Sequence, residues 1–294
     1  MKNLDIIIPL YNEEDNLLEL INSLSSVKDQ LKDKLNISLL FVNDGSTDDS
    51  LELLKKISWE KKYVKVVSLS KNFGYQIAIA AGIDNSNADY ACIIDSDLQD
   101  PPSLILDMYN KSLEGFDIVY GKFSQNENDS AFIKSIKNVF NWVIKKTLST
   151  DIYLRDDFIF LSKTVLDTLK SMPEKHRFLR EMIDWSGYKS TVLSFDREEL
   201  YSKSIYTPWR QYLFFVRSIL SSSIRPLKLT YILAGLLFLI SVISFIKLNM
   251  ISSTVLFVGA VQIFALGIVS SYIGRLFEQV KGRPLYIVKD KFNF

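Results

Sequence analysis

The sequence predicts an α/β protein in which an open, mostly parallel β-sheet is flanked by helices and followed by an interfacial helix and a transmembrane helical hairpin. Two observations lead to this fold class. Up to Gly121, short and almost continuously apolar segments alternate with segments of helical period, which is typical of strands covered by helices on both faces. Two long uncharged segments then follow near the end of the chain.

The composition excludes several classes of function. The 294 residues include 35 Lys and Arg against 34 Asp and Glu, so the chain has no overall positive field that would hold a nucleic acid. Cys92 is the only cysteine, which excludes an intramolecular disulfide and a multi-cysteine zinc site. Because His176 is the only histidine, carboxylates remain as the ligands for a metal ion. The apolar run at the start of the chain is too short for a signal peptide, which predicts a cytosolic N-terminal part.

The first part of the predicted sheet has strands at residues 4–10, 37–43, 64–70, 90–95 and 116–121, with helices at 13–24, 46–58, 74–85 and 102–113. Pro9 is expected to stop the pairing of the first strand, because proline lacks the N–H that a ladder needs. In such a sheet the ligand binds beyond the carboxyl ends of the strands. The sequence contains neither G-x-G-x-x-G nor G-x-x-x-x-G-K-[ST], which disfavours a dinucleotide-binding turn and a P-loop.

Beyond Phe123 the pattern is helical as far as Thr147, strands are expected again at 157–163 and 188–196, and helices at 163–172 and 177–185. The segment 206–227 combines aromatic and aliphatic bulk with Arg210 and Arg217, and it places Pro208 where a helix would begin. We interpret this segment as an amphipathic helix that lies in the membrane interface. A core helix is the alternative.

Two apolar segments predict a membrane anchor. There are 18 uncharged residues between Lys228 and Lys247, and 27 between Lys247 and Arg275. A hydrocarbon core about 30 Å thick needs roughly 20 helical residues, so each segment is long enough to cross once. Basic residues flank both ends of this hairpin, which places both ends on the cytoplasmic side of the cell (inner) membrane. Two buried soluble helices are the alternative.

The predicted organisation is a cytosolic domain over residues 1–205, an interfacial helix over 206–227, two transmembrane helices over 228–274 and a cytoplasmic tail over 275–294. The lipid bilayer is thus an expected partner. A polar position such as Gln262 within the hairpin is compatible with a homo-oligomer that would bury it.

Acidic residues gather after the expected strands. The stretch "IIDSDLQDPP" places Asp95, Asp97 and Asp100 within six positions, where mutual repulsion raises the cost of keeping all three ionised. A divalent cation would remove that cost, and Mg²⁺ takes its oxygen ligands from one or two carboxylates together with phosphate and water. A solvated turn is the alternative for these aspartates. Asp44 and Ser46 in "NDGSTDD" could simply cap the following helix.

Five stretches in this order carry a family resemblance: "IIPLYNEE", "VNDGSTDDS", "LSKNFGYQIAIAAGID", "IIDSDLQDPP" and "YIGRLFEQVKGRPLYIV". Together they resemble glycosyltransferase family 2, and more narrowly the polyprenyl-phosphate sugar transferases of the dolichyl-phosphate-mannose and bactoprenol-glucosyltransferase type. The resemblance runs over nearly the full length and implies a GT-A type sheet. A lone D-x-D motif would be weak, whereas "DSDLQDPP" after a strand and in order with the other stretches is specific.

The resemblance implies a site for the sugar donor. Asp97 would hold a Mg²⁺ or Mn²⁺ ion and also serve catalysis, with Gln99 as a neighbouring ligand and Asp95 against the nucleoside and the metal. Asp44 would accept a hydrogen bond from the base, which favours a pyrimidine such as uracil and hence a UDP-sugar. Lys71 would face the diphosphate, with a solvated lysine as the alternative. The nucleotide-sugar pocket implied in this way consists of Pro9, Tyr11, Glu13, Asp44, Lys71, Asp95 and Asp97.

The resemblance also implies an acceptor site. "DDFIFLSK" is similar to a family segment that would make Asp157 the carboxylate that positions the acceptor oxygen. The lipid phosphate would be bound by Lys122, Lys134 and Arg197. This chain has Ile159 and Leu200 where the family motifs carry arginines, and because lysine and arginine bind phosphate differently, these departures concern the acceptor and leave the donor site untouched.

The function implied is the inverting, metal-dependent transfer of glucose or a similar hexose from a nucleoside diphosphate-sugar to a polyprenyl phosphate, such as undecaprenyl phosphate, at the cytoplasmic membrane face. Two alternatives stay open. The same donor chemistry could act on another lipid or glycan acceptor, or the chain could be a degenerate, non-catalytic membrane partner. His176 and Cys92 are interpreted as structural residues.

Overall fold

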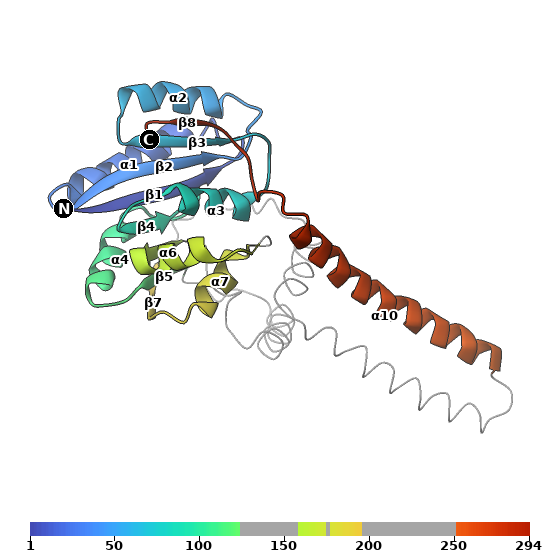
Figure 1. Ribbon diagram of the computed structural model, residues 1–294. Helices are drawn as coiled ribbons and strands as arrows, with labels where there is room; N and C mark the ends of the chain where they lie inside the picture. Colours follow the sequence, from blue (N-terminus) through green and yellow to red (C-terminus); the bar gives the residue numbers. More distant parts are fainter. Residues whose placement is uncertain (124–157, 175–176, 196–250) are drawn as a thin grey trace, which may run out of the picture. The chain divides into compact units, whose positions relative to one another are not determined.

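The computed structural model describes residues 1–123, 158–174, 177–195 and 251–294. The chain divides into two compact units. The first consists of Met1–Ser130, Asp151–Ser204 and Pro284–Phe294, and the second of Ala131–Thr150 and Ile205–Arg283. The first unit carries a β-sheet with helices on both sides (Figure 1).

The sheet has eight strands in the order β7-β5-β6-β4-β1-β2-β3-β8. Their bounds are β1 Lys2–Leu10, β2 Leu35–Asn43, β3 Val64–Leu69, β4 Tyr90–Ile93, β5 Ile118–Phe123, β6 Ile159–Ser162, β7 Ser190–Phe195 and β8 Val288–Phe292. β4, β1, β2 and β3 form a parallel centre. β6 runs antiparallel to β4 and to β5, and β8 runs antiparallel to β3. β7 runs parallel to β5. The sheet is therefore mixed but mostly parallel, because only β6 and β8 run against the other six strands.

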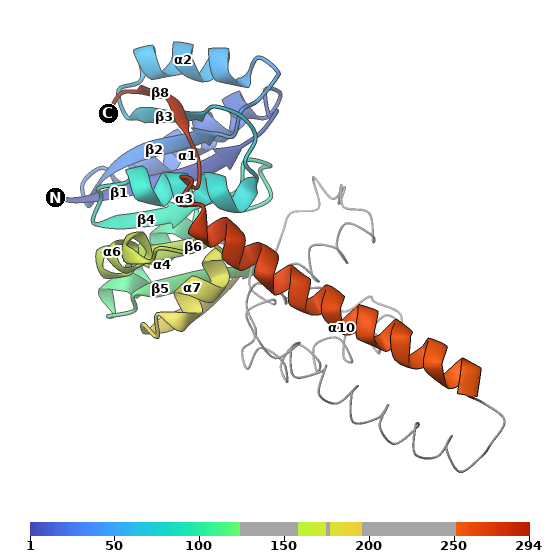
Figure 2. The ribbon, with the colours of Figure 1, turned by 45° about the vertical axis from the view of Figure 1, so that its right-hand side comes forward.

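Helices cover both faces of this sheet (Figures 1 and 2). Side chains of α1, α2 and α4 belong to one apolar cluster with one face of the strands, and those of α3, α6 and α7 to a second cluster with the other face. In β1, Ile6 and Ile8 belong to the first cluster and Ile7 to the second, as strand alternation requires. The helices span α1 Leu17–Leu31, α2 Ser50–Glu60, α3 Tyr75–Asn85, α4 Leu104–Leu113, α6 Lys163–Ser171 and α7 Leu179–Trp185.

The first strand ends at Leu10 as expected, but the expectation that Pro9 stops its pairing is wrong, because β1 stays in register with β2 to Leu10. The backbone oxygen of Leu10 accepts from Asp44 N on the β2 side, and that of Ile7 accepts from Ile94 N on the β4 side. Because both backbone groups of a residue in a parallel strand point to the same neighbour, the nitrogen of Pro9 faces the β4 side. There the ladder has already ended at Ile7, so no hydrogen bond is lost.

A glycine sets the close packing of α3 on the sheet. A Cβ atom on Gly82 would lie 2.3 Å from Cγ2 of Ile7 and 3.2 Å from Cγ2 of Val42. Such a distance is far below van der Waals contact, so only glycine lets α3 approach β1 and β2 this closely. The start of α3 is thereby held near the carboxyl ends of the central strands.

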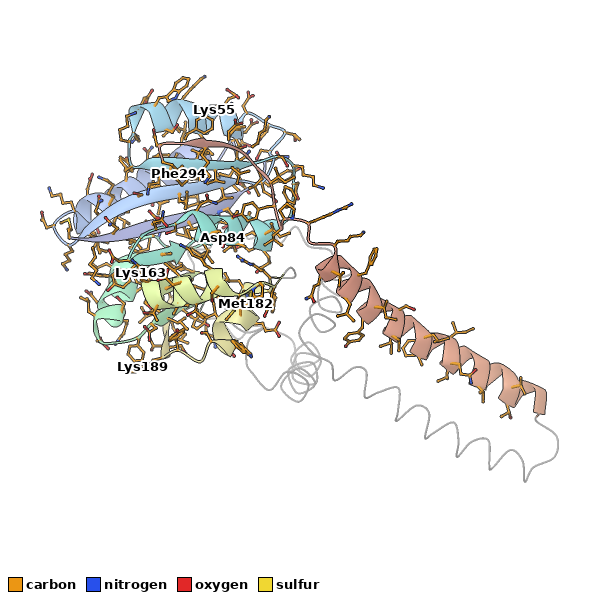
Figure 3. The ribbon with its side chains drawn as sticks, viewed as in Figure 1. Lys55, Asp84, Lys163, Met182, Lys189 and Phe294 are labelled. Atoms are coloured by element: carbon orange, nitrogen blue, oxygen red, sulfur yellow. The ribbon has the colours of Figure 1, made fainter. Side chains whose placement is uncertain are left out.

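The end of the chain returns to the sheet as β8, a strand that we did not expect from the sequence. Ser70 N donates to the backbone oxygen of Ile287 (2.9 Å), and the side chain of Asn293 donates to the backbone oxygen of Val64 (2.8 Å). The Tyr286 hydroxyl donates to Oδ2 of Asp84 (3.1 Å). Asp84, labelled in Figure 3, lies on α3. The tail is therefore part of the first unit.

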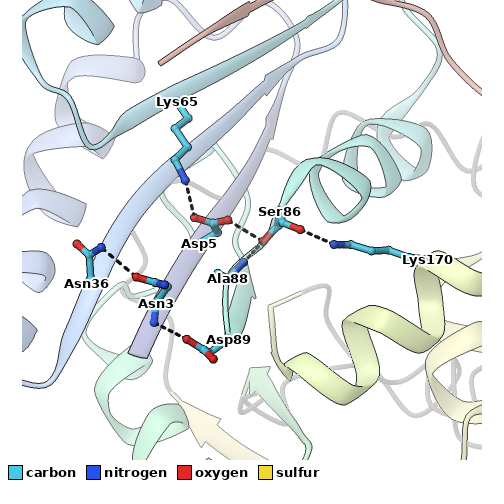
Figure 4. Close-up of polar contacts among 8 residues, drawn as sticks. All are labelled: Asn3, Asp5, Asn36, Lys65, Ser86, Ala88, Asp89 and Lys170. Carbon is cyan, nitrogen blue, oxygen red and sulfur yellow. Dashed lines mark hydrogen bonds and ion pairs between the residues drawn. The ribbon is translucent and has the colours of Figure 1, made fainter. Parts of the chain in front are cut away.

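A buried polar network holds the amino-terminal half of β1 (Figure 4). Asp5 is 3% exposed, and it pairs with Lys65 Nζ (3.3 Å) and accepts from the Ser86 hydroxyl (2.7 Å). Lys170 donates to the backbone oxygen of Ser86. Because a buried carboxylate is tolerated only when it is paired and hydrogen-bonded, we assign this network a structural role.

In the second unit, the second predicted apolar segment forms part of α10, a helix of 30 residues over Ile251–Val280. Several of its large apolar side chains are exposed, among them Val255, Ile263, Phe264, Leu266, Ile273 and Val280. Within the part of the chain that the structure describes, no helix combines the length and the apolar character that a membrane crossing requires. The predicted interfacial helix at 206–227 and the first predicted crossing lie outside the described residues.

Candidate active site

The carboxyl ends of the four parallel strands lie along one edge of the sheet, as the pairing of β4, β1, β2 and β3 requires. Each of these strands is followed by a polar loop, and three of the loops supply the predicted acids. Glu13 follows β1, Asp44 follows β2, and Asp95 and Asp97 follow β4. The sheet thus gathers residues that are far apart in sequence at the edge where open α/β sheets bind their ligands.

Asp44 holds the turn between β3 and α3. It is 3% exposed, and its two carboxylate oxygens accept from the backbone amides of Phe73 (2.7 Å) and Gly74 (2.8 Å). Burial raises the pKa of Asp44, although the two amide hydrogen bonds lower it. Gly74 has φ = +100°, a conformation that favours glycine. The sequence had suggested a base-binding role for Asp44. Each of its oxygens can accept a second hydrogen bond, so a role in fixing the turn is compatible with that one.

The loop after β2 also touches the loop after β3 through Gly45. A Cβ atom on Gly45 would lie 2.4 Å from the carbonyl carbon of Lys71 and 2.6 Å from Asn72 N. The side chain of Lys71 is exposed, and its Nζ lies 5.1 Å from the ring centre of Phe73. Lys71 is therefore at the predicted edge of the sheet.

A hydrogen-bond network that sequence reasoning missed joins the loops after β1 and β2. The backbone N–H of Asn12 donates to Ser46 Oγ (3.0 Å), and the side-chain Oδ1 of Asn12 accepts from Thr47 N (2.8 Å). The Glu13 amide donates to Ser50 Oγ (3.0 Å). Asn12 has φ = +57°, which asparagine tolerates better than most residues. The only sign of this network in the sequence is a pair of short polar stretches, "YNEE" and "GSTDDS". Which residue of one stretch contacts which residue of the other depends on the register of β1 and β2, and the sequence does not give that register.

Two further predicted pocket residues, Pro9 within β1 and Tyr11 just after it, differ in exposure. Pro9 is buried beside Val42, its partner in register on β2, whereas the side chain of Tyr11 is 44% exposed. An exposed aromatic ring at this edge offers a flat surface for a ligand, while Pro9 contributes to the core beneath it.

The acids after β4 have separate supports. Asp95 Oδ1 accepts from the Tyr75 hydroxyl at the start of α3. Asp97 Oδ1 accepts from Gln99 N (3.1 Å) across a turn in which Leu98 has φ = +61°. Two aspartates separated by one residue therefore have different partners, a side chain of α3 for Asp95 and the backbone of the same loop for Asp97.

Asp100 differs from these two acids because it is only 3% exposed. Burial and then the charge of Asp100 raise the pKa of the Cys92 thiol, which is fully buried in β4. Asp100 thus lies towards the core under this edge of the sheet. Its position fits the prediction of a residue that shapes the loop.

Several carboxylates at this edge lie close enough to act on one another. Burial raises the pKa of Glu13, and the charges of Asp97, Asp48 and Asp15 raise it further, while a hydrogen bond from Asn16 (2.9 Å) lowers it. Among the residues that the structure describes, no three histidine, cysteine, aspartate or glutamate side chains form a ready-made metal cluster. One or two carboxylates suffice for Mg²⁺ when phosphate and water complete its shell, so Asp97 with Asp95 suits such an ion as part of a complex with a phosphorylated ligand.

Much of the predicted acceptor site lies outside the described residues, namely Asp157, Lys134, Arg197 and Leu200, together with His176. Lys122 is described. It is exposed on β5 and lies opposite Ser194 of β7. Ile159 is fully buried in β6, opposite Ile93, so this position contributes to the core. An arginine at position 159 could bind a phosphate only if its side chain pointed out of the apolar cluster to which Ile159 belongs.

The architecture is that of a GT-A type glycosyltransferase. It is similar to the crystal structure of a mannosyltransferase from Pyrobaculum calidifontis, solved in complex with GDP-mannose and Mn²⁺ (TM-score 0.53, 17% identity, 76% of this chain and 64% of that chain covered). The sequence defines the family. Residues 5–168 match the family model "Glycosyl transferase family 2", and the chain belongs to this family.

Curated relatives match over almost the whole chain. An uncharacterized glycosyltransferase of Synechocystis sp. is 36% identical over 303 residues, which cover 98% of this chain and 95% of the relative. A bactoprenol glucosyl transferase of Shigella phage SfII is 28% identical over 302 residues, which cover 97% of both chains. The protein is therefore an enzyme that transfers a sugar, and the alternative of a non-catalytic partner is not supported.

Proposed function

We propose that this enzyme transfers a hexose from a UDP-sugar to a polyprenyl phosphate, with inversion at the anomeric carbon and with the help of a divalent metal ion. The proposal is carried by one observation, the convergence of Glu13, Asp44, Asp95 and Asp97 at the carboxyl edge of β1, β2 and β4. It is supported by the similarity, over almost the full length, to bactoprenol glucosyl transferases. That edge suits a nucleoside diphosphate-sugar because it presents Tyr11 and Asp44 for the nucleoside and the acids Asp95 and Asp97 for a diphosphate with its metal ion.

The donor would lie across three loops of this edge. The nucleoside would occupy the pocket lined by Tyr11 and Asp44, where the buried carboxylate of Asp44 can accept a hydrogen bond from the N–H of uracil. The diphosphate would then lie towards Asp95 and Asp97. Lys71, which lies between β3 and α3, would approach the diphosphate from that loop. The acids repel a bare diphosphate, so the arrangement requires a cation between them.

Asp97, Gln99 and Asp95 would hold that cation. When bound, Mg²⁺ or Mn²⁺ neutralises the charge that develops on the departing diphosphate. The side chains themselves orient the donor, so that the bond between the anomeric carbon and the diphosphate oxygen points away from the acceptor. The Mn²⁺ seen with the mannosyltransferase of similar fold is compatible with this choice.

In the transfer itself, an oxygen of the acceptor phosphate forms the new bond to the anomeric carbon while the bond to the UDP oxygen breaks. This single displacement predicts inversion. A phosphate monoester is largely ionised near pH 7, since its second pKa is about 6, so no strong base is required. Asp157 would serve chiefly to position the attacking oxygen, and Lys122, Lys134 and Arg197 would bind the lipid phosphate.

We further propose that the reaction takes place at the cytoplasmic face of the cell membrane. This part of the proposal depends on the two apolar segments of the sequence and on the apolar side chains that α10 exposes. Extraction of membranes with alkaline carbonate tests it. An integral attachment predicts that the chain stays in the pellet, and its release into the supernatant would contradict this part.

Another lipid or glycan acceptor stays open for one reason. Ile159, which is buried, stands where the family motif carries an arginine, so the site has one phosphate-binding arginine fewer. Membranes that contain the enzyme should be incubated with a labelled UDP-hexose and undecaprenyl phosphate. The proposal predicts a labelled lipid whose sugar is released by mild acid. A labelled lipid that resists mild acid, formed on a glycolipid or diacylglycerol, would favour this other acceptor.

A further inference from the structure

The β3–α3 turn connects two of the carboxylates that the proposed function assigns to the donor. The amides of Phe73 and Gly74 donate to Asp44, and the next residue, Tyr75, donates its hydroxyl hydrogen to Asp95 Oδ1. Three consecutive residues thus contact the carboxylate after β2 and the carboxylate after β4. Neither our sequence reading nor the family resemblance assigned a role to Tyr75.

Tyr75 is held on a rigid support. It is the first residue of α3, whose packing against β1 depends on the close approach of Gly82 to Ile7. The turn before it is fixed by the two hydrogen bonds to the buried carboxylate of Asp44. A side chain whose backbone is held on both sides in this way can orient a partner accurately.

We infer that Tyr75 is a positioning residue of the donor site, which acts through Asp95. A hydrogen bond from a phenol to one carboxylate oxygen restricts rotation of the carboxylate plane. Asp95 then presents a defined orientation towards the region where the diphosphate and its metal ion bind. The inference rests on the proposed function, because it assigns Asp95 to the donor.

Different groups of the β3–α3 turn contact Asp44 and Asp95: backbone amides contact Asp44, and a side chain contacts Asp95. The base pocket around Asp44 is held by backbone amides, which a change of the Tyr75 side chain leaves in place. The hydroxyl of Tyr75 donates to Asp95, at the other end of the site. A ligand that lacks the diphosphate should therefore be insensitive to the loss of this hydroxyl.

The variant Tyr75→Phe tests the inference, since it keeps the ring and removes the hydroxyl. In the full chain, we expect Tyr75→Phe to weaken the binding of UDP in the presence of Mn²⁺ about tenfold, the size of one hydrogen bond to a charged group. The affinity for uridine should stay unchanged. Tyr188→Phe is the matched control, because it also removes a hydroxyl hydrogen bond, to Thr168 Oγ1 (2.8 Å), from a tyrosine on the same sheet domain.

A double-mutant cycle with Asp95→Ala tests whether Tyr75 acts through Asp95. In the Asp95→Ala background, Tyr75→Phe should cause no further loss of UDP binding. A further tenfold loss in that background would overturn the inference, as would equal binding of UDP by the wild type and Tyr75→Phe. Equal losses for uridine and UDP would indicate damage to the turn and would also overturn it. A wild-type chain that binds no UDP with Mn²⁺ would instead contradict the proposed function, and the inference would fall with it.

Discussion

Gly45 and Lys71 approach each other so closely that a Cβ atom on Gly45 would lie 2.4 Å from the carbonyl carbon of Lys71. This contact joins the loop after β2 to the loop after β3. The Asp44 carboxylate joins the same two loops, because it accepts from the amides of Phe73 and Gly74. Gly45 also has φ = +70°, so an L side chain there meets both backbone strain and a backbone clash. The two loops can pack this closely only because position 45 lacks a side chain.

Gly45→Ala should therefore destabilise the protein and weaken nucleotide binding. The positive φ alone costs about 1–2 kcal/mol, and the clash adds to this because backbone atoms cannot move aside. Gly187→Ala is a matched control, since Gly187 has the same φ of +70° but no atom within 4 Å of its added Cβ. Unfolding in denaturant should show a larger loss for Gly45→Ala, and only this variant should bind UDP more weakly. Equal losses of stability in the two variants would contradict the predicted clash.

Asp44→Asn should open the β3–α3 turn. One side-chain oxygen becomes an NH₂ group, which cannot accept from the amide of Phe73 or Gly74, and a buried amide left unpaired costs about 1–3 kcal/mol. We expect lower stability together with a loss of UDP binding of at least tenfold. Asp89→Asn serves as the control, because Asp89 also accepts from a backbone amide, that of Asn3 (2.9 Å). If Asp89→Asn reduced UDP binding as much, the effect would be one of stability alone.

The sequence predicted the central fold well because the signals there are local. Apolar runs and helical periods located the strands and most helices to within about four residues, although α1 continues to Leu31 where its end was expected at residue 24. The acids after β1, β2 and β4 were found because open sheets bind ligands at strand ends. The strand β8 was missed, although Val288, Asp290 and Phe292 alternate with exposed lysines. A short charged strand at the edge of a sheet gives the same pattern as a solvated tail.

The contacts between loops could not be predicted for a different reason. The pairs Asn12 with Thr47 and Tyr75 with Asp95 depend on the register of strands that are distant in sequence, and one sequence does not reveal that register. The mixed character of the sheet has the same origin. The direction of β6 beside β4 follows from the path of the chain, on which its apolar pattern carries no information.

Glu13→Gln should alter the pH dependence of stability. Burial raises the pKa of Glu13 above 4.5 in the folded protein, so the folded state binds more protons than the unfolded state between pH 4.5 and the raised value. Glu13 therefore makes the free energy of unfolding fall as the pH rises through this window. In Glu13→Gln this fall is absent, and the variant should gain stability relative to the wild type as the pH rises above 4.5. Denaturant unfolding at a series of pH values measures the difference.

Asp97→Asn should remove most of the activity without unfolding the protein. An amide can still accept from Gln99 N, so the turn after β4 should persist, but the loss of a negative charge weakens the hold on a divalent ion. We expect a fall in kcat of at least about a hundredfold, in the range seen when a group that stabilises developing charge is removed. The dependence of UDP binding on Mn²⁺ should also decrease. Asp107→Asn, at an exposed position on α4, should leave both unchanged.

Lys122→Ala should discriminate between the acceptor and donor sides of the site. Lys122 is exposed near the end of β5, two residues after Tyr120, which pairs with Ile159 at the start of β6. It therefore lies at the end of the sheet where the chain segment after Asp157 enters. If it binds the lipid phosphate, its removal should raise the KM for undecaprenyl phosphate about threefold to tenfold, while the KM for the UDP-hexose stays the same. Lys189→Ala is the control, since Lys189 precedes β7 at the opposite end of the β5–β7 pair. A change in the KM of the donor instead would show that Lys122 belongs to the nucleotide-sugar pocket.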